Sequence, residues 1–96
     1  MKYFLYILKT ELNTLYCGTT NDVLKRFKAH LEGKGAKYTK SHKPKNIVYV
    51  DEFEDKSKAL KEEYRIKKTL SKSQKIELIE KNKEKTEKFL KEFSSI

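Results

Sequence analysis

Residues 2–9 place apolar side chains on both faces of one extended segment, and no other feature restricts the fold as strongly. Aromatic and branched residues favour a β-strand, in which successive side chains point to opposite sides. Each face carries three apolar side chains, Tyr3, Leu5 and Ile7 on one and Phe4, Tyr6 and Leu8 on the other. Because both faces are apolar, we expect this strand to be central in its sheet.

The segments that follow predict a hairpin and then a helix. Residues 14–17, TLYC, read as a second strand after the turn residues 11–13, and Gly18 ends that strand. Thr20 or Asn21 can cap a helix that runs to about Leu31.

The rest of the chain alternates loop, strand and helices. Residues 32–46 hold two of the three glycines and the one proline, so they predict a loop, and residues 46–50 predict a third strand. The expected helices start at Asp55 or Ser57, running to about Lys68, and at a capping box of Ser71 with Gln74, which points Ile76, Leu78 and Ile79 inward.

These elements predict an α+β fold with a small, mostly antiparallel three-stranded sheet flanked by helices. The order is ββαβαα plus a C-terminal helix, with residues 1–81 as one domain and residues 82–96 as a charged helix packed on it. This tail alternates Lys and Glu, and an apolar stripe of Phe89, Leu90 and Phe93 docks it.

Charge indicates an anionic partner. Lys and Arg number 23 against 14 Asp and Glu, a net charge of +9, which makes nucleic acid the first candidate. Residues 32–46 are the most basic stretch. We expect Lys34, Lys37, Tyr38 and Lys40 in this loop to hold a nucleic-acid backbone, and His42 to be simply exposed.

The cysteine content and the N-terminus bear on location. Cys17 is the only cysteine, which suits a reducing cytoplasm, and no Cys/His quartet for zinc exists. The apolar run near the N-terminus is too short for a membrane span or a signal peptide. We therefore expect a cytoplasmic protein without membrane contact.

The first predicted helix carries two polar residues beside its apolar stripe. At about 100° per residue, Arg26 and His30 lie next to Val23, at the edge of the stripe. The alternative is an arginine whose stem covers apolar surface while its head reaches water. The stripe itself comprises Val23, Leu24, Phe27 and Leu31.

Glu63 is unusual because it projects from the apolar face of the second long helix. A carboxylate rarely lies in such a face unless it is paired or holds a metal. The alternative is an ion pair with Arg or Lys, which still places a cation against Glu63. Glu62 lies further round the helix. The face consists of Ala59, Leu60, Ile66 and Leu70.

Two tyrosines complete a chemical set. Tyr6 and Tyr16 lie on adjacent strands, although tyrosine also suits half-buried strands in general, and Cys17 is most simply a small buried hydrophobe. The set fits phosphodiester cleavage: one divalent metal on Glu63, Arg26 neutralising a phosphate oxygen, and a phenol or His30 activating water. No second acidic residue is well placed, so a two-metal site is not expected.

Several ordered blocks resemble the GIY-YIG nuclease superfamily. They are FLYIL, LYCGTTNDVLKRFKAH, EGKGAKYTK and SKALKEEYRIKKTLSKSQK. The last two resemble its small, single-domain bacterial branch, the UPF0213-like proteins. The resemblance covers about residues 3–80, and the tail beyond residue 82 lies outside it.

The resemblance implies roles for six residues. Tyr6 matches the tyrosine of the first half-motif and is by this likeness the expected general base, assisted by Tyr16 or His30. The other matches are Tyr16 and Gly18 with the second half-motif, Arg26 with the catalytic arginine, His30 with the helix histidine and Glu63 with the metal-binding glutamate. Phe4-Leu5 and Cys17 depart from the pattern at backbone or packing positions.

The sequence thus predicts an endonuclease that uses Mg²⁺ or Mn²⁺ on Glu63 and acts on DNA, with RNA as a further substrate. The alternative is an accessory module that binds nucleic acid without turnover. A third reading is a nuclease subunit that needs a protein partner, and a homodimer is also left open.

Overall fold

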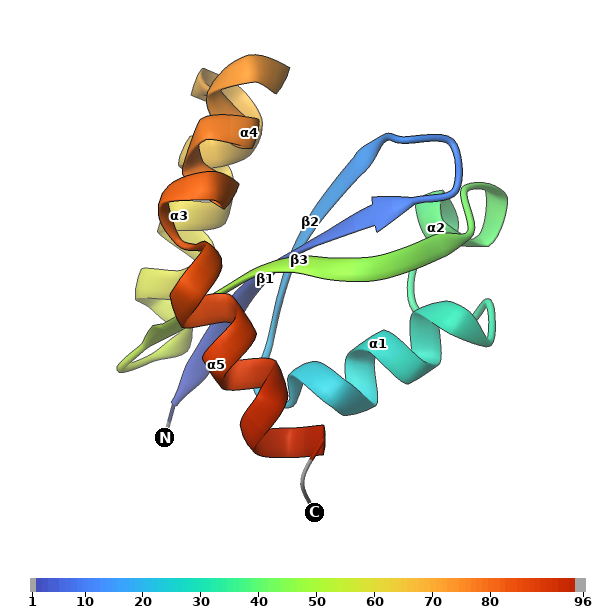
Figure 1. The fold of residues 1–96 in the computed structure, drawn as a ribbon, viewed down its shortest axis with the longest axis horizontal. Helices are drawn as coiled ribbons and strands as arrows, with labels where there is room; N and C mark the ends of the chain where they lie inside the picture. The colour runs from blue at the N-terminus through green and yellow to red at the C-terminus, as the bar shows by residue number, and fades with distance from the viewer. Residues whose placement is uncertain (1, 95–96) are drawn as a thin grey trace.

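The fold centres on a three-stranded antiparallel sheet with the order β2-β1-β3. The computed structural model describes residues 2–94. Its strands are β1 (Tyr3–Thr10), β2 (Leu15–Thr20) and β3 (Pro44–Phe53). The expected α+β class and the central position of the first strand are confirmed (Figure 1).

Among the described residues, five helices flank this sheet, one more than the sequence predicted. They are α1 (Val23–Leu31), α2 (Lys37–Ser41), α3 (Lys56–Thr69), α4 (Lys72–Lys81) and α5 (Lys83–Ser94). The expected loop at residues 32–46 was partly wrong, because it contains α2 and the start of β3. Pro44 begins that strand on an edge of the sheet, where a missing N–H is tolerated.

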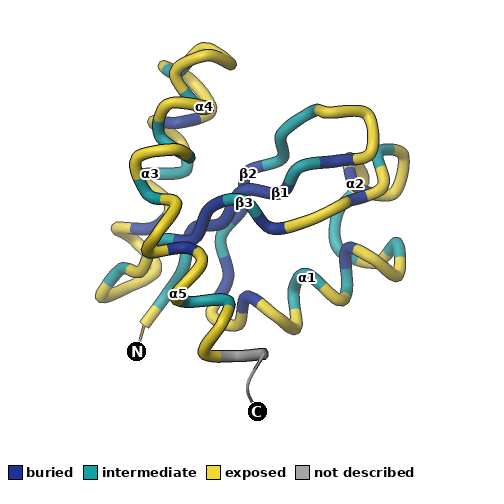
Figure 2. Tube along the Cα trace, viewed as in Figure 1, coloured by how far each residue is buried: buried dark blue, intermediate teal, exposed yellow. Residues whose placement is uncertain are grey.

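Each face of the sheet has its own apolar cluster. On one face Leu5 and Ile7 pack with Ile66 of α3 and with residues of α4. On the other face Tyr6 and Leu8 pack with residues of α1 and α5. Figure 2 shows the buried residues gathered along the three strands. A strand with two apolar faces needs this double cover, because each exposed face would leave apolar surface in water.

Helix caps show which boundaries the sequence predicted well. Asp55 caps α3 by accepting from the Lys58 N–H, and Ser71 with Gln74 forms the expected capping box of α4. The expected cap of α1 at Thr20 or Asn21 was wrong. Asp22 caps it, because its carboxylate reaches the N–H three residues on.

The buried side of α1 also differs from the predicted stripe. Val23 and His30 are buried and Phe27 is half-buried, whereas Leu24 and Leu31 are exposed. His30 therefore lies in the core and not at its edge. The apolar pattern could not reveal this, because hydrogen bonds to partners distant in sequence are what allow an imidazole to be buried.

Two further apolar residues lie on the solvent side of their helices. Leu60 of α3 and Ile76 of α4 are exposed, contrary to the prediction, while Leu78 and Ile79 pack on the core as predicted. Phe89 and Leu90 of α5 pack against the second cluster, and the side chain of Phe93 lies outside the described part.

Helix α5 and the residue before it, Asn82, bind the β3 edge through hydrogen bonds. The Val50 N–H donates to Thr86 Oγ1 at 3.1 Å, and Asn82 Nδ2 donates to the Val50 carbonyl at 2.9 Å. None of the described helices is long and apolar enough to span a lipid bilayer.

Candidate active site

A chain of buried hydrogen bonds joins β1, α1 and α2. The Tyr6 hydroxyl lies 2.7 Å from His30 Nε2, and His30 Nδ1 lies 2.6 Å from Thr39 Oγ1. Thr39 donates its own proton to the Ala36 carbonyl at 3.2 Å. Its oxygen must therefore accept from His30, so Nδ1 carries the proton and Nε2 accepts from Tyr6. We call these three side chains, Tyr6, His30 and Thr39, the buried triad.

Burial keeps the triad neutral at ordinary pH. Burial, and secondly the charge of Arg26, lowers the pKa of His30 from 6.5 to about 4. Burial raises the pKa of Tyr6 to about 12, against the lowering influence of the Arg26 guanidinium. Both shifts favour the uncharged form, as desolvation requires.

Two glycines make room for the triad. A Cβ at Gly18 would lie 2.6 Å from the Tyr6 hydroxyl oxygen, and a Cβ at Gly35 would collide with the His30 ring. Gly18 pairs with Tyr6 across the strands. Gly35 and Thr39 were not predicted, because their partner His30 comes from a different element and no local pattern links them.

Arg26 lies one turn before His30 on α1, and only part of its hydrogen-bonding capacity is used. Its Nη2 donates to the Gly35 carbonyl at 2.8 Å, while its buried Nε has no hydrogen-bond partner among the described residues. None of the ion pairs between described residues involves Arg26. The guanidinium therefore keeps its full charge beside the triad.

Tyr16 connects the triad to the surface. Its ring lies edge-on to His30, with centroids 5.2 Å apart, and 6.4 Å from the Tyr6 ring. It also stacks on Tyr38 at 5.8 Å, and Tyr38 stacks on His42 at 4.2 Å. His42 is thus half-buried in an aromatic row and not simply exposed as predicted.

Glu63 of α3 lies near β2, the edge strand that carries Tyr16. Its side chain is 18% exposed, and Oε2 pairs with Lys67 Nζ at 2.6 Å, the kind of cation the sequence predicted against it. The Lys67 ammonium lies 5.6 Å from the centre of the Tyr16 ring. Burial, and secondly the charge of Glu63, raises the pKa of the Cys17 thiol to about 12. Cys17 is the small buried residue that was predicted.

Lys67 also borders two hollows that meet at this edge. One, of about 270 Å³, is lined by Leu15, Tyr16, Cys17, Tyr38, Lys67 and Lys75. The other, of about 250 Å³, is lined by Leu60, Glu63, Tyr64, Lys67 and Lys68. Tyr16 and Glu63 are therefore reached from solvent on either side of one lysine.

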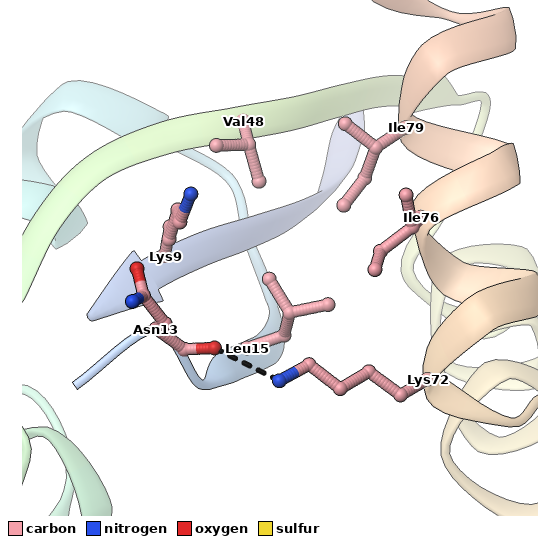
Figure 3. Close-up of a pocket in the computed structure, with 7 residues that line it drawn as sticks. All are labelled: Lys9, Asn13, Leu15, Val48, Lys72, Ile76 and Ile79. Atoms are coloured by element: carbon pink, nitrogen blue, oxygen red, sulfur yellow. Dashed lines mark hydrogen bonds between the residues drawn. The ribbon is translucent and has the colours of Figure 1, made fainter. Parts of the chain in front are cut away.

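A third hollow, which shares Leu15 with the first, lies between the hairpin turn and α4 (Figure 3). It measures about 300 Å³, and its walls are mainly the apolar side chains of Leu15, Val48, Ile76 and Ile79. At its rim Lys72 Nζ donates to the Asn13 carbonyl at 3.1 Å. No acidic or histidine side chain lines it, so it offers no chemistry for hydrolysis.

The donors for a metal are few. Among the described residues no group of three or more His, Cys, Asp and Glu side chains could hold an ion. Glu63 is a single, partly open carboxylate, and Mg²⁺ commonly binds one or two carboxylates while keeping waters and contacting phosphates. This residue fits such an ion, provided that Lys67 moves off it. Its neighbour Glu62 pairs with Arg65 instead.

The predicted nucleic-acid contacts gather around α2. Lys34, Lys37 and Lys40 are exposed, and none of them forms an ion pair with another described residue. Tyr38 belongs to the aromatic row beside them. The structure thus unites Tyr6, Tyr16, Arg26 and His30 in one group, and Glu63 joins this group through Lys67.

A comparison with known families agrees with this fold. Residues 2–77 match the model of the GIY-YIG catalytic domain. The chain belongs to the GIY-YIG family, whose domain is a nuclease fold.

Within that family the chain is similar to bacterial UPF0213 proteins. It is 47% identical to one from Staphylococcus haemolyticus, over 82% of this chain and 95% of that protein. It is 45% identical to one from Clostridium perfringens, over 95% of this chain and 97% of that protein. The solution NMR structure of a UPF0213 protein from Bacillus halodurans superposes with a TM-score of 0.57 at 37% identity, covering 86% and 87% of the two chains.

Proposed function

We propose that this chain is an endonuclease that hydrolyses phosphodiester bonds of DNA with a divalent metal ion, RNA being the further substrate. One observation carries the proposal. An arginine that forms no ion pair with another described residue lies beside a buried Tyr–His pair, and a partly exposed carboxylate on α3 pairs with the lysine that lies over the Tyr16 ring. In such a site the arginine can bind a phosphate while the carboxylate binds a metal ion.

Arg26 binds the scissile phosphate. Its guanidinium is oriented by the Gly35 carbonyl and keeps spare donors, so it can offset the negative charge that grows on the phosphate oxygens in the transition state. An arginine already paired with a carboxylate would lose most of this effect.

Glu63 holds one Mg²⁺ or Mn²⁺. Such an ion supplies Lewis-acid stabilisation of phosphate charge. Lys67 must leave Glu63 for this, and the hollows on both sides of Lys67 give its ammonium room to meet a backbone phosphate instead.

Tyr16 is the phenol best placed to act as the base: its hydroxyl first releases its own proton to solvent in the hollow, and the resulting phenolate then takes a proton from the attacking water. By resemblance Tyr6 is the expected general base, but its hydroxyl is buried and donates to His30. Tyr16 borders a hollow and contacts both rings of the pair. We assign Tyr6 and His30 the role of fixing the orientation of Tyr16 and Arg26.

The exposed side chains of Lys34, Lys37, Tyr38 and Lys40 hold the nucleic acid on the α2 side of the site, where the three lysines form no ion pair with another described residue. Residues 1–81 form the nuclease unit in this proposal. The C-terminal helix stabilises it by covering the β3 edge.

A binding module without turnover is the second candidate. The basic segment alone would suit it, and so would the Lys67 ion pair, which occupies Glu63 in this structure. A binding module does not account for Arg26, which forms no ion pair with another described residue, or for the buried triad beside it.

The deciding experiment compares Glu63→Gln with Glu62→Gln. Wild-type protein is incubated with single strands, duplexes, flaps, branched DNA and RNA in Mg²⁺, in Mn²⁺ and in EDTA. We expect the wild type to cleave in a metal-dependent manner. Glu63→Gln should abolish this cleavage and Glu62→Gln should keep it, and both variants should bind nucleic acid as the wild type does. Binding without cleavage of any substrate in either metal would instead establish the second candidate.

A further inference from the structure

The outer side of α3 carries two exposed apolar side chains around Glu63. Tyr64 is 66% exposed and Leu60 is 43% exposed, and they lie one helical turn apart. Both line the same hollow of about 250 Å³ as Glu63, Lys67 and Lys68. The core of the fold uses neither of them, so their packing does not explain why they are apolar.

Cations accompany this apolar pair. Lys68 Nζ lies 6.0 Å from the centre of the Tyr64 ring, and Lys67 borders the hollow on its inner side. An aromatic ring beside ammonium groups is the combination that binds single-stranded nucleic acid, because bases stack on the ring while phosphates meet the cations. A protein or lipid partner would explain the apolar pair but not its position around the carboxylate.

The hollow neighbours a second one beside the basic segment. Lys67 lines both this hollow and the one that contains Tyr16 and Tyr38. A strand held by α2 can therefore pass Tyr16 and Lys67, cross Glu63 and reach Tyr64. The two ends of this route lie on opposite sides of the proposed metal ligand.

We propose that Tyr64 and Leu60 bind the base of an unpaired nucleotide next to the scissile phosphate, with Lys67 and Lys68 on its phosphates. This placement relative to the cut rests on the proposed function. A base can stack on Tyr64 only when it has left its own duplex, so the preferred substrate is single-stranded or branched at this position.

The chain contains no tryptophan, so Tyr64→Trp introduces a single indole fluorophore at the proposed contact. The matched control is Leu12→Trp in the hairpin turn, because Leu12 is also 66% exposed. Both variants are titrated in EDTA, which prevents metal-dependent cleavage. The probes are a single-stranded oligonucleotide, the same strand without bases and a blunt duplex.

We expect the single strand to quench the indole fluorescence of Tyr64→Trp, and the abasic strand and the duplex to quench it weakly. The fluorescence of Leu12→Trp should remain unchanged with all three probes. Tyr64→Ala should weaken single-strand binding by about 5- to 100-fold, the range for losing one stacked base. Tyr64→Phe should bind like the wild type, and duplex affinity should change little.

Unquenched fluorescence of Tyr64→Trp while anisotropy reports bound single strand would overturn the inference, and so would wild-type affinity of Tyr64→Ala. A complete lack of oligonucleotide binding would contradict it as well. Cleavage by the wild type is measured separately. If the wild type cleaves but single strand does not quench the fluorescence of Tyr64→Trp, only this inference is wrong. If the fluorescence is quenched but the wild type does not cleave, only the proposed nuclease activity is wrong.

Discussion

The two sides of the candidate site are built in opposite ways. On the α1 side the buried triad is closed, neutral and fully hydrogen-bonded, with two glycines fitted around it. On the α3 side Glu63 and Lys67 form one partly exposed ion pair between two hollows. The α1 side is therefore already in its final arrangement, whereas on the α3 side Glu63 and Lys67 can each exchange the other for a new partner.

This difference assigns separate tasks to the two sides. Groups that must offset transition-state charge act best when they need no rearrangement, which suits Arg26 beside the rigid triad. A residue that must accept a metal and then release it needs solvent access and a replaceable partner, which suits Glu63. We therefore expect each substitution on the α1 side to change turnover or folding, and substitutions on the α3 side to act through the binding of the metal ion or of the nucleic acid.

The largest effect is expected for Arg26→Ala, which should lower turnover by about 10²–10³-fold, the range for removing one transition-state donor. Its melting temperature should change little, because the side chain is only half-buried. Arg65→Ala is the control, since Arg65 pairs with Glu62 on the exposed side of α3. A large loss of stability with normal saturated turnover would show that Arg26 serves packing.

The second prediction concerns the glycines around the triad. Gly18→Ala and Gly35→Ala should each destabilise the fold by about 1–3 kcal/mol, the cost of overpacking a tight core. Both should also shift the NMR signals of the His30 ring. Gly33→Ala is the control: it adds left-handed strain at a φ of 75° but meets no atom within 4 Å, so the His30 signals should stay in place. Unshifted His30 signals in Gly35→Ala would contradict the tight fit.

The features that could be predicted from the sequence all have a local signal. The apolar residues of β1 form an unbroken run that covers both of its faces, so its central position could be predicted. Glu63 was singled out because a carboxylate interrupts a helical stripe, and its role stays a prediction. Both signals lie within a few residues of the chain. The cap of α3 and the capping box of α4 are equally local, and they too were predicted.

The triad could not be predicted because its contacts are not local. Thr39 and Gly35 lie in a segment that reads as a loop, and only folding brings them against His30. For the same reason His30 was expected at the edge of a stripe, although hydrogen bonds at both ring nitrogens allow it to be buried. Lys67 was overlooked as one of many lysines, and only the structure distinguishes it.

The third prediction uses the neutral state of His30. Its pKa is about 4 in the folded chain against 6.5 for an ordinary histidine, so the unfolded chain binds more protons between these values. Stability should therefore be complete above about pH 6.5 and fall as the pH drops toward 4. Thermal unfolding over this range measures the effect. His30→Asn should flatten this part of the profile, whereas His42→Asn, which leaves the triad intact, should keep it.

The smallest effect is expected on the α3 side, for Lys67→Met. Lys67 and a metal ion compete for the Glu63 carboxylate, so removing the ammonium should tighten Mn²⁺ binding in the absence of nucleic acid. A partly exposed ion pair contributes about 0.2–1 kcal/mol, so affinity should rise by about 1.4- to 5-fold. Electron paramagnetic resonance of free Mn²⁺ measures this, with Lys68→Met as the control because Lys68 lines the same hollow without pairing with Glu63. The same variant should bind DNA more weakly, since Lys67 then has no charge for a phosphate. Unchanged or weaker Mn²⁺ binding would mean that Lys67 does not exchange with the metal, and that the α3 side is as fixed as the triad.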